Sequence, residues 1–184
     1  MTPDAIARAI ARAIARAIAH LGHAPPRWLL VDVVRQRLWL LHGRDPVADW
    51  PVSTGAAGVG TREGSGATPP GLHRIDRKIG AGADPGAVFI SRQPTGEVWS
   101  GETDPRDLIL GRILTLEGCE DGLNRGPGHD TRERYIYLHG TNHEDRIGEP
   151  CSHGCVRLRR ADMLDVFDRV EAGDPVLIDP GDPS

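Results

Sequence analysis

A dense group of reactive side chains lies toward the C-terminal end of the chain, within the 17 residues from 139 to 155. It consists of His139, His143, Cys151, Ser152, His153 and Cys155. A cysteine attacks a carbonyl carbon as the thiolate, so it needs a base or a positive charge beside it. His139 ends an alternating, strand-like segment, and it can be that base if the strand end faces Cys155. The spacing therefore favours a cysteine nucleophile that carries out acyl transfer.

The residues next to Cys155 fit the same chemistry. Gly154 lets the backbone turn sharply, and the amides of Gly154 and Cys155 could then point into one pocket, as an oxyanion hole requires. Arg157 follows two residues later. Its guanidinium could hold a substrate carboxylate or raise the positive potential at the thiolate, and a surface ion pair is the alternative role.

Two other interpretations of these residues compete. The pairs His139/His143 and Cys151/Cys155 could supply a Cys2His2 zinc set, but the usual zinc knuckle has two residues between its cysteines and this chain has three. Alternatively, Cys155 is a small buried hydrophobe, as an isolated cysteine usually is. The density of reactive side chains argues against that, so we expect a cysteine site without metal or cofactor.

The overall composition indicates one globular domain. The 184 residues are 39% hydrophobic and 26% charged. A net charge of −4 gives no reason to expect nucleic acid or an anionic membrane as a partner. The 23 glycines and 15 prolines predict short strands and turns. Three cysteines do not make a disulfide framework, and reduced thiols fit a cytosolic protein.

Residues 1–22 repeat a four-residue unit that predicts an amphipathic helix, with Thr2 as N-cap, Pro3 at the first helical position and Gly22 as C-cap. Its apolar stripe is Ile6, Ile10, Ile14 and Ile18. We expect this stripe to dock on the domain or on a second copy of the chain, with a membrane-surface helix as the alternative. Because arginine interrupts every apolar run, the segment is predicted to be neither a secretory signal nor a transmembrane span.

For the rest of the chain, the sequence predicts a linker at 23–27, a domain at 28–179 and a tail at 180–184. Three strands are predicted within 28–55, and further strands at 71–77, 87–91, 134–140 and 175–178. Apolar residues at 108, 109, 110, 113, 114 and 116 predict a helix within 106–118, and another helix is predicted to end at Gly173. The fold class is therefore mainly β with two or three helices, one of them N-terminal.

The segment from His139 to Leu158, "HGTNHEDRIGEPCSHGCVRL", resembles the signature of the L,D-transpeptidase catalytic domain (YkuD-type) family. That signature is a histidine followed by Ser/Thr-His-Gly-Cys and, two residues later, an arginine or asparagine; here 16 positions separate His139 from Cys155. "TPPGLHRI" at 68–75, the strands within 28–55, "RYIYLHGTN" and the closing "GDPVLI" also resemble the family. The resemblance covers about residues 28–178.

This resemblance implies a β-sandwich with the nucleophile in a groove under a loop, and chemistry on peptidoglycan stem peptides. It implies Cys155 as nucleophile, His139 as general base and the carbonyl of Gly140 as the group that orients the imidazole. The oxyanion site would be framed by His153, Gly154 and Cys155. Residues implied on the substrate side are Ser152, Tyr137 and Arg157.

In such a reaction, the thiolate attacks the carbonyl of the third stem residue, D-alanine leaves and a thioester remains. Water then gives a tripeptide, whereas an amine gives a 3→3 cross-link. The sequence shows no export signal, and it is similar to family members without signal peptides that act as L,D-carboxypeptidases in murein recycling. We therefore expect a cytoplasmic L,D-carboxypeptidase. The alternatives are a periplasmic L,D-transpeptidase and, in another class, a non-catalytic peptidoglycan-binding domain.

Several positions depart from the family pattern or lie outside it. His73 stands where an aromatic residue is common, so we expect it to be structural, and we expect Cys151 to serve packing. The Gly-rich loop 56–70 is long and could change access to the groove. Trp99 and Arg112 lie in the central insert and are candidates for shaping substrate binding.

Overall fold

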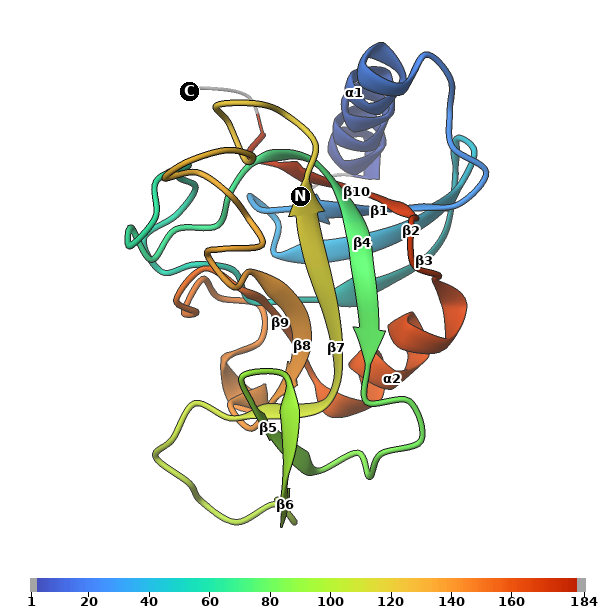
Figure 1. Cartoon of the computed structure of the whole chain (residues 1–184). Helices are drawn as coiled ribbons and strands as arrows, with labels where there is room; N and C mark the ends of the chain where they lie inside the picture. Colours follow the sequence, from blue (N-terminus) through green and yellow to red (C-terminus); the bar gives the residue numbers. More distant parts are fainter. Residues whose placement is uncertain (1–2, 182–184) are drawn as a thin grey trace.

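The computed structural model describes residues 3–181, which form a mostly β fold (Figure 1). Its strands are β1 (Trp28–Asp32), β2 (Arg37–His42), β3 (Asp45–Pro51), β4 (Gly71–Ile79), β5 (Ala87–Ile90), β6 (Gln93–Val98), β7 (Ile109–Gly118), β8 (Tyr137–Thr141), β9 (Val156–Leu158) and β10 (Pro175–Asp179). Its helices are α1 (Pro3–Leu21), α2 (Arg160–Arg169) and the short 3-10 helix η1 (Glu144–Arg146).

All ten strands join one mixed sheet in the order β3-β2-β1-β10-β4-β7-β5-β6, and β8 continues from β7 to β9. The pairs β1/β10 and β8/β9 are parallel, and the remaining pairs are antiparallel. Side chains from β1, β2, β3 and β10 share one hydrophobic core with side chains from β7, β8, β9 and α2. The long strands β4 and β7 connect these two groups (Figure 1). The expected sandwich is thus a single sheet folded over its own core.

Helix α2 covers the core between β7 and β8. Met163, Val166 and Phe167 are buried, and their spacing of three and four residues gives the helix one apolar face. The helix ends at Arg169, because Val170 already has extended backbone angles. Gly173, the predicted end, instead lies in the turn before β10, with a φ of 93°.

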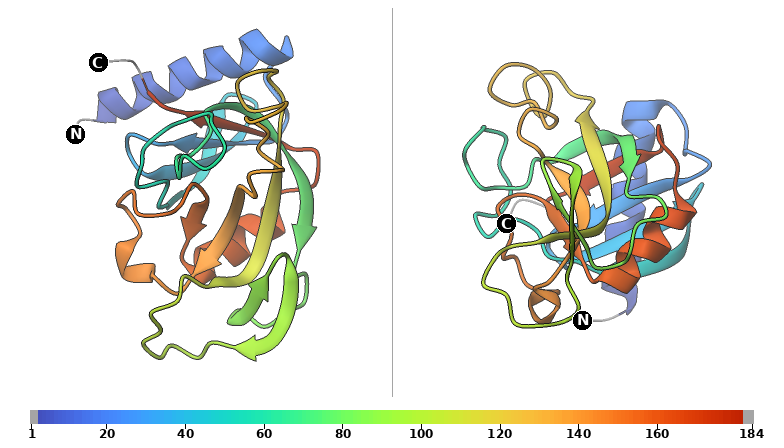
Figure 2. Two further views of the ribbon diagram at one scale, coloured as in Figure 1. Left: turned by 60° about the vertical axis from the view of Figure 1, so that its left-hand side comes forward. Right: turned by 60° about the horizontal axis from the view of Figure 1, so that its bottom comes forward.

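Helix α1 packs on the outside of the sheet (Figure 2). The domain itself was one of the positions that the sequence predicted for the isoleucine stripe. Ile10, Ala13, Ile14 and Ala17 pack against Trp28, Leu30, Leu41 and Leu177. The helix ends with Gly22 at a φ of 78°, and its amide donates to the carbonyl of Ile18 at 2.8 Å. The predicted N-cap Thr2 lies outside the described residues. The isoleucine stripe is therefore covered by the chain's own domain.

The predicted helix within 106–118 is wrong, because this segment is the central strand β7. Its pairing partners are β8 on one edge and, on the other edge, β4 along residues 113–118 and β5 at residues 109 and 110. A strand covered on both faces is apolar almost throughout and does not alternate. The pairing with β8 also shifts between Leu110 and Ile113, where Gly111 has a φ of 68°. This bulge interrupts the two-residue period of the strand, so the apolar residues fall at positions that resemble the spacing of a helix.

Smaller differences occur at strand ends. The exposed strand β6 was not predicted, since its Gln, Pro and Gly residues carry no strand signal. Strand β8 begins at Tyr137, three residues after the predicted start, because residues 134–136 turn into it. Within residues 3–181, no helix is both long enough and apolar enough to cross a membrane.

Candidate active site

The parallel pair of β8 and β9 places the candidate catalytic residues. Leu138 pairs with Val156 and His139 pairs with Arg157. Leu138 and Val156 point into the main core, so the residues on either side of them point to the opposite face. His139 and Arg157 thus share that face, and Cys155 precedes β9 diagonally from His139. The structure thus places the base and nucleophile candidates on one face of the sheet.

A hydroxyl group holds the turn that carries Cys155. The Oγ of Ser152 donates to the carbonyl of Cys155 at 2.6 Å and accepts from the amide of Gly154 at 3.1 Å. Gly154 has a φ of 121°, and a Cβ there would lie 3.0 Å from the carbonyl oxygen of Ala67. Thr68 fixes the turn from outside, because its hydroxyl donates to the carbonyl of Gly154 at 2.9 Å. Cys155 therefore sits on a backbone turn that several hydrogen bonds hold in place.

The amide of Gly154 points into this turn and not into a pocket, which corrects the expected Gly154–Cys155 pair of oxyanion donors. Within residues 3–181, the amides of His153 and Cys155 donate no hydrogen bond. These two amides are the available donors for an oxyanion. Gly154 shapes the turn that presents them.

His139 is arranged as a neutral base. Its Nδ1 lies 2.8 Å from the carbonyl oxygen of Gly140, and a carbonyl only accepts, so Nδ1 carries the proton. The lone pair is then on Nε2. Burial lowers the pKa of His139 well below its usual 6.5. Gly140 is required here because a Cβ would lie 2.6 Å from the carbonyl oxygen of Leu110.

Cys155 rests as a thiol. Its burial in the site raises its pKa to about 11, although the amide of Tyr137 and the guanidinium of Arg157 act in the opposite direction. The Sγ lies 3.4 Å from the carbonyl oxygen of Tyr135, a residue held at a φ of 55°. Within the described chain, no hydrogen bond joins this sulfur to His139. The resting site is thus a neutral thiol beside a neutral imidazole, and not a preformed ion pair.

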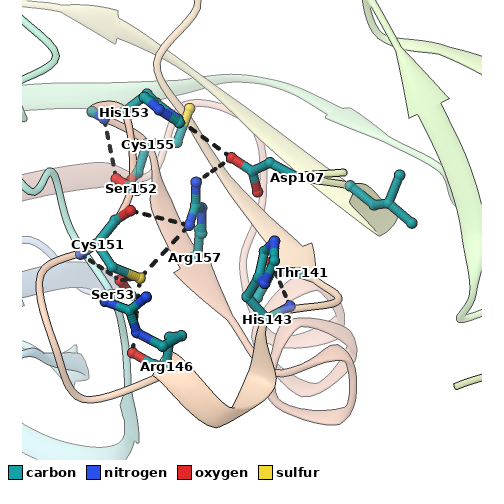
Figure 3. A network of polar contacts seen from close by, with 12 residues as sticks. Ser53, Asp107, Thr141, His143, Arg146, Cys151, Ser152, His153, Cys155 and Arg157 are labelled. Atoms are coloured by element: carbon teal, nitrogen blue, oxygen red, sulfur yellow. Dashed lines mark hydrogen bonds and ion pairs between the residues drawn. The ribbon is translucent and has the colours of Figure 1, made fainter. Parts of the chain in front are cut away.

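Arg157 is buried and already paired (Figure 3). Its guanidinium forms an ion pair with Asp107, and its Nη1 reaches the carbonyl and the Sγ of Cys151 at 3.4 and 3.7 Å. The carboxylate of Asp107 thus takes the place considered for a substrate carboxylate. A buried guanidinium needs such a partner, because an uncompensated charge is costly to bury.

Asp107 is the site residue that sequence reasoning missed. It also lies 3.5 Å, Oδ2 to Nδ1, from the exposed imidazole of His153. The segment that carries it was taken for a helix, so no signal connected it with Arg157. Asn142 holds the segment in place: its Oδ1 accepts from the amide of Leu108 at 2.9 Å, and its Nδ2 donates to the carbonyl of Arg106 at 2.8 Å.

The other candidates occupy varied positions. Tyr137 is buried with Phe89 and Ile113 in a small cluster against which Cys155 packs, so it forms the wall behind the sulfur. Its hydroxyl has no hydrogen-bond partner among the described residues. Cys151 has polar neighbours, with the Oγ of Ser53 at 3.1 Å from its Sγ, so packing alone does not describe it.

The three remaining candidates each contact other parts of the fold. His73 is buried and bonded to the carbonyl of Gly71 at 3.0 Å, which agrees with a structural role. Trp99 packs in a cluster with Val88, and its Nε1 donates to the carbonyl of Glu102 at 2.8 Å. The guanidinium of Arg112 stacks 5.5 Å from the ring centre of Phe167.

The Gly-rich loop 56–70 forms one wall of the site. Arg134 ties it down, with Nη1 donating to the carbonyl of Gly60 at 3.1 Å and Nη2 to that of Ala67 at 2.7 Å. Between this loop, residues 133–136 and His153 lies a cavity of about 440 Å³. The expected influence of the loop on access therefore has a structural basis.

The candidate zinc ligands are not assembled. Over residues 3–181, no group of three or more His, Cys, Asp or Glu side chains lies close enough together to hold a metal ion. Cys151 faces Ser53 and Arg157, whereas Cys155 faces the carbonyl of Tyr135. The Cys2His2 alternative has no support in this geometry.

The site thus combines Cys155 in a braced Ser-His-Gly-Cys turn, two available amides and His139, which lies in the middle of β8 and not at a strand end as the sequence predicted. The sequence profile of the L,D-transpeptidase catalytic domain (YkuD) matches residues 26–178. The chain belongs to this family. None of the curated protein sequences compared with it matches.

Solved structures share the fold at low sequence identity. An L,D-transpeptidase from Mycobacterium smegmatis is 18% identical with a TM-score of 0.50, over 84% of this chain and 58% of that one. One from Mycobacterium tuberculosis H37Rv is 17% identical with a TM-score of 0.52, over 84% and 58%. An L,D-transpeptidase from Xylanimonas cellulosilytica is 19% identical with a TM-score of 0.51, over 89% and 68%. The chain thus spans 58% of the length of each of the two mycobacterial structures.

Proposed function

We propose that this protein catalyses cysteine-dependent acyl transfer on peptidoglycan stem peptides, with Cys155 as nucleophile and His139 as general base. The observation that carries the proposal is the orientation of His139. The carbonyl of Gly140 fixes the proton on Nδ1, so the basic Nε2 is left for the face of the sheet that also carries Cys155.

The proposed reaction starts from neutral partners, so proton transfer accompanies the attack. The thiol turns from the carbonyl of Tyr135 toward Nε2 of His139, which takes its proton as Sγ bonds to the carbonyl carbon of the third stem residue. The amides of His153 and Cys155 donate to the oxyanion. The carbon–nitrogen bond then breaks, the imidazolium returns the proton to the departing D-alanine amine, and a thioester remains on Cys155.

For the fate of the thioester we propose hydrolysis, which makes the protein an L,D-carboxypeptidase. Beside Arg157 lies a second cavity of about 220 Å³. This volume suits a departing amino acid and then water, and it is small for a second stem peptide. The alternative acceptor is the amine of another stem, which would give a 3→3 cross-link.

Product analysis tests this function. The purified protein is incubated with disaccharide-tetrapeptide, and the mixture is resolved by mass spectrometry. We expect tripeptide and free D-alanine in equal amounts, and no turnover by a Cys155→Ala variant. A predominance of cross-linked dimers would make the protein an L,D-transpeptidase instead. If no product forms and imipenem leaves Cys155 unmodified, the non-catalytic peptidoglycan-binding alternative holds. Imipenem is a suitable probe because one solved relative is described in complex with it.

We further propose that the substrates are soluble muropeptides and that the place of action is the cytoplasm. A hydrolase of free stem peptides needs no polymeric murein. Fractionation of cells that carry the native gene checks this, and recovery of the protein in the periplasm would contradict it.

A further inference from the structure

A small pocket lies beside Arg157, and Figure 3 shows most of the side chains that line it. We call it the Arg146 pocket. It has a volume of about 220 Å³ and is lined by Pro105, Asp107, His143, Arg146, Cys151, His153 and Arg157. The charged and titratable residues of this lining are two arginines, two histidines, one cysteine and one aspartate, so residues that can donate hydrogen bonds outnumber the single carboxylate.

Arg146 carries the second positive charge among the residues that line this pocket. Asp107 neutralises the buried Arg157. Arg146 has only a loose ion pair, 3.6 Å from Nε to the 71%-exposed Glu149. In the described part of the chain, neither Nη of Arg146 nor the ring of His143 donates a hydrogen bond. The Nε of Arg157 is also buried without a partner. The pocket therefore offers several unused donors for an anion.

The pocket adjoins the nucleophile. His153 lines both this pocket and the larger cavity under loop 56–70, and it is two residues from Cys155. Arg157 and Asp107 lie close enough to Cys155 to shift the pKa of its thiol. In a peptide, the terminal carboxylate follows the last scissile carbonyl by one residue, about 3.8 Å along the chain. The carboxylate site of such an enzyme must therefore lie close to its nucleophile, as this pocket does through His153 and Arg157.

We propose that the Arg146 pocket binds the terminal α-carboxylate of the amino acid that leaves, with Arg146 as the main charged contact and His143 as a second donor. This deepens the proposed function and rests on it. An enzyme that removes one terminal residue must distinguish a free carboxylate from an internal peptide bond. A guanidinium that can bind both carboxylate oxygens makes that distinction.

Two substrates that differ only in the terminal group test this pocket. One is a stem tetrapeptide with a free carboxylate, and the other carries a terminal carboxamide. The wild-type protein should cleave the carboxylate form with a kcat/KM about 10- to 100-fold higher, the range for losing one charge-assisted hydrogen bond. Arg146→Met should bring the carboxylate form down to the carboxamide level and leave the carboxamide form unchanged within about twofold. Arg146→Lys should restore part of the preference.

The matched control is Arg125→Met, the same replacement at an exposed arginine paired with Asp121 outside the pocket. It should leave both substrates unaffected. A readout without turnover is binding to a Cys155→Ser variant, where the carboxylate form should bind about 10-fold tighter or more. Equal cleavage of both forms by wild type, or an equal loss on both forms in Arg146→Met, would overturn the pocket assignment. Failure of the proposed function would look different, because wild type would then cleave neither form.

Discussion

Two buried histidines of this protein, His73 in β4 and His139 in β8, start from the same physical situation. Each is fully enclosed, each has Nδ1 on a backbone carbonyl, and burial lowers the pKa of each well below 6.5. They differ at the other nitrogen. The Nε2 of His73 lies 3.1 Å from the hydroxyl of Thr131, whereas His139 has no such partner in the described structure and lies beside Cys155.

The difference shows that burial and a lowered pKa do not by themselves make a catalytic histidine. A satisfied second nitrogen makes His73 a core residue that links β4 to the loop before β8. The Nε2 of His139 has no hydrogen-bond partner in the described structure, and it lies next to a thiol that also rests neutral, so His139 is a candidate base. Its environment keeps it unprotonated at neutral pH, which a base requires.

The largest expected effect separates the two histidines by activity. His139→Gln should slow acylation of Cys155 by about two to four orders of magnitude, the usual range for a lost general base. His73→Gln should leave acylation per folded molecule within about twofold, because it acts only on stability. The rate of mass increase at Cys155 with imipenem measures both. An equal loss in the two variants would show that the comparison of their Nε2 environments is mistaken.

A second effect concerns the state of the nucleophile. With a pKa of about 11, the thiolate fraction of Cys155 increases about tenfold per pH unit between pH 7 and pH 10. Alkylation by iodoacetamide, resolved by residue in peptide mass spectrometry, should follow that slope. A rate that is already constant from pH 6 upward would indicate a preformed thiolate–imidazolium pair, and His139 would then rest protonated.

The smallest expected effect is the contribution of His73 to the pH dependence of the protein's stability. Burial lowers the pKa of His73 to about 4 from 6.5, so the unfolded state takes up a proton first as the pH decreases. Its contribution to stability is therefore complete above pH 6.5 and is lost as the pH decreases through 4, by about 3 kcal/mol in total.

Urea unfolding of wild type and His73→Gln at pH 7.5 and pH 4.5 measures this loss. The variant should be less stable at pH 7.5 and should lose less stability on acidification. The difference between the two proteins removes the contribution of the carboxylates that both share. Identical losses in both would mean that His73 is not the group that takes up the proton.

Local patterns determined much of this protein. The spacing of His139 and Cys155, the Ser-His-Gly-Cys turn and the glycines at 140 and 154 are properties of consecutive residues, and so is the isoleucine stripe of α1. A docked helix needs only one apolar face, and a motif needs only its residue types at fixed spacing. These features were therefore predictable without coordinates.

Tertiary structure alone decided the rest. The segment 109–118 is a strand because β4 and β8 pair with it, and its bulge at Gly111 hides the strand period. Asp107 meets Arg157 only because β9 and the segment before β7 converge, 50 residues apart in sequence. Likewise, the partner of the Nε2 of His73 is Thr131, which is 58 residues away in sequence. Pairing and burial depend on such long-range contacts, which no local pattern encodes.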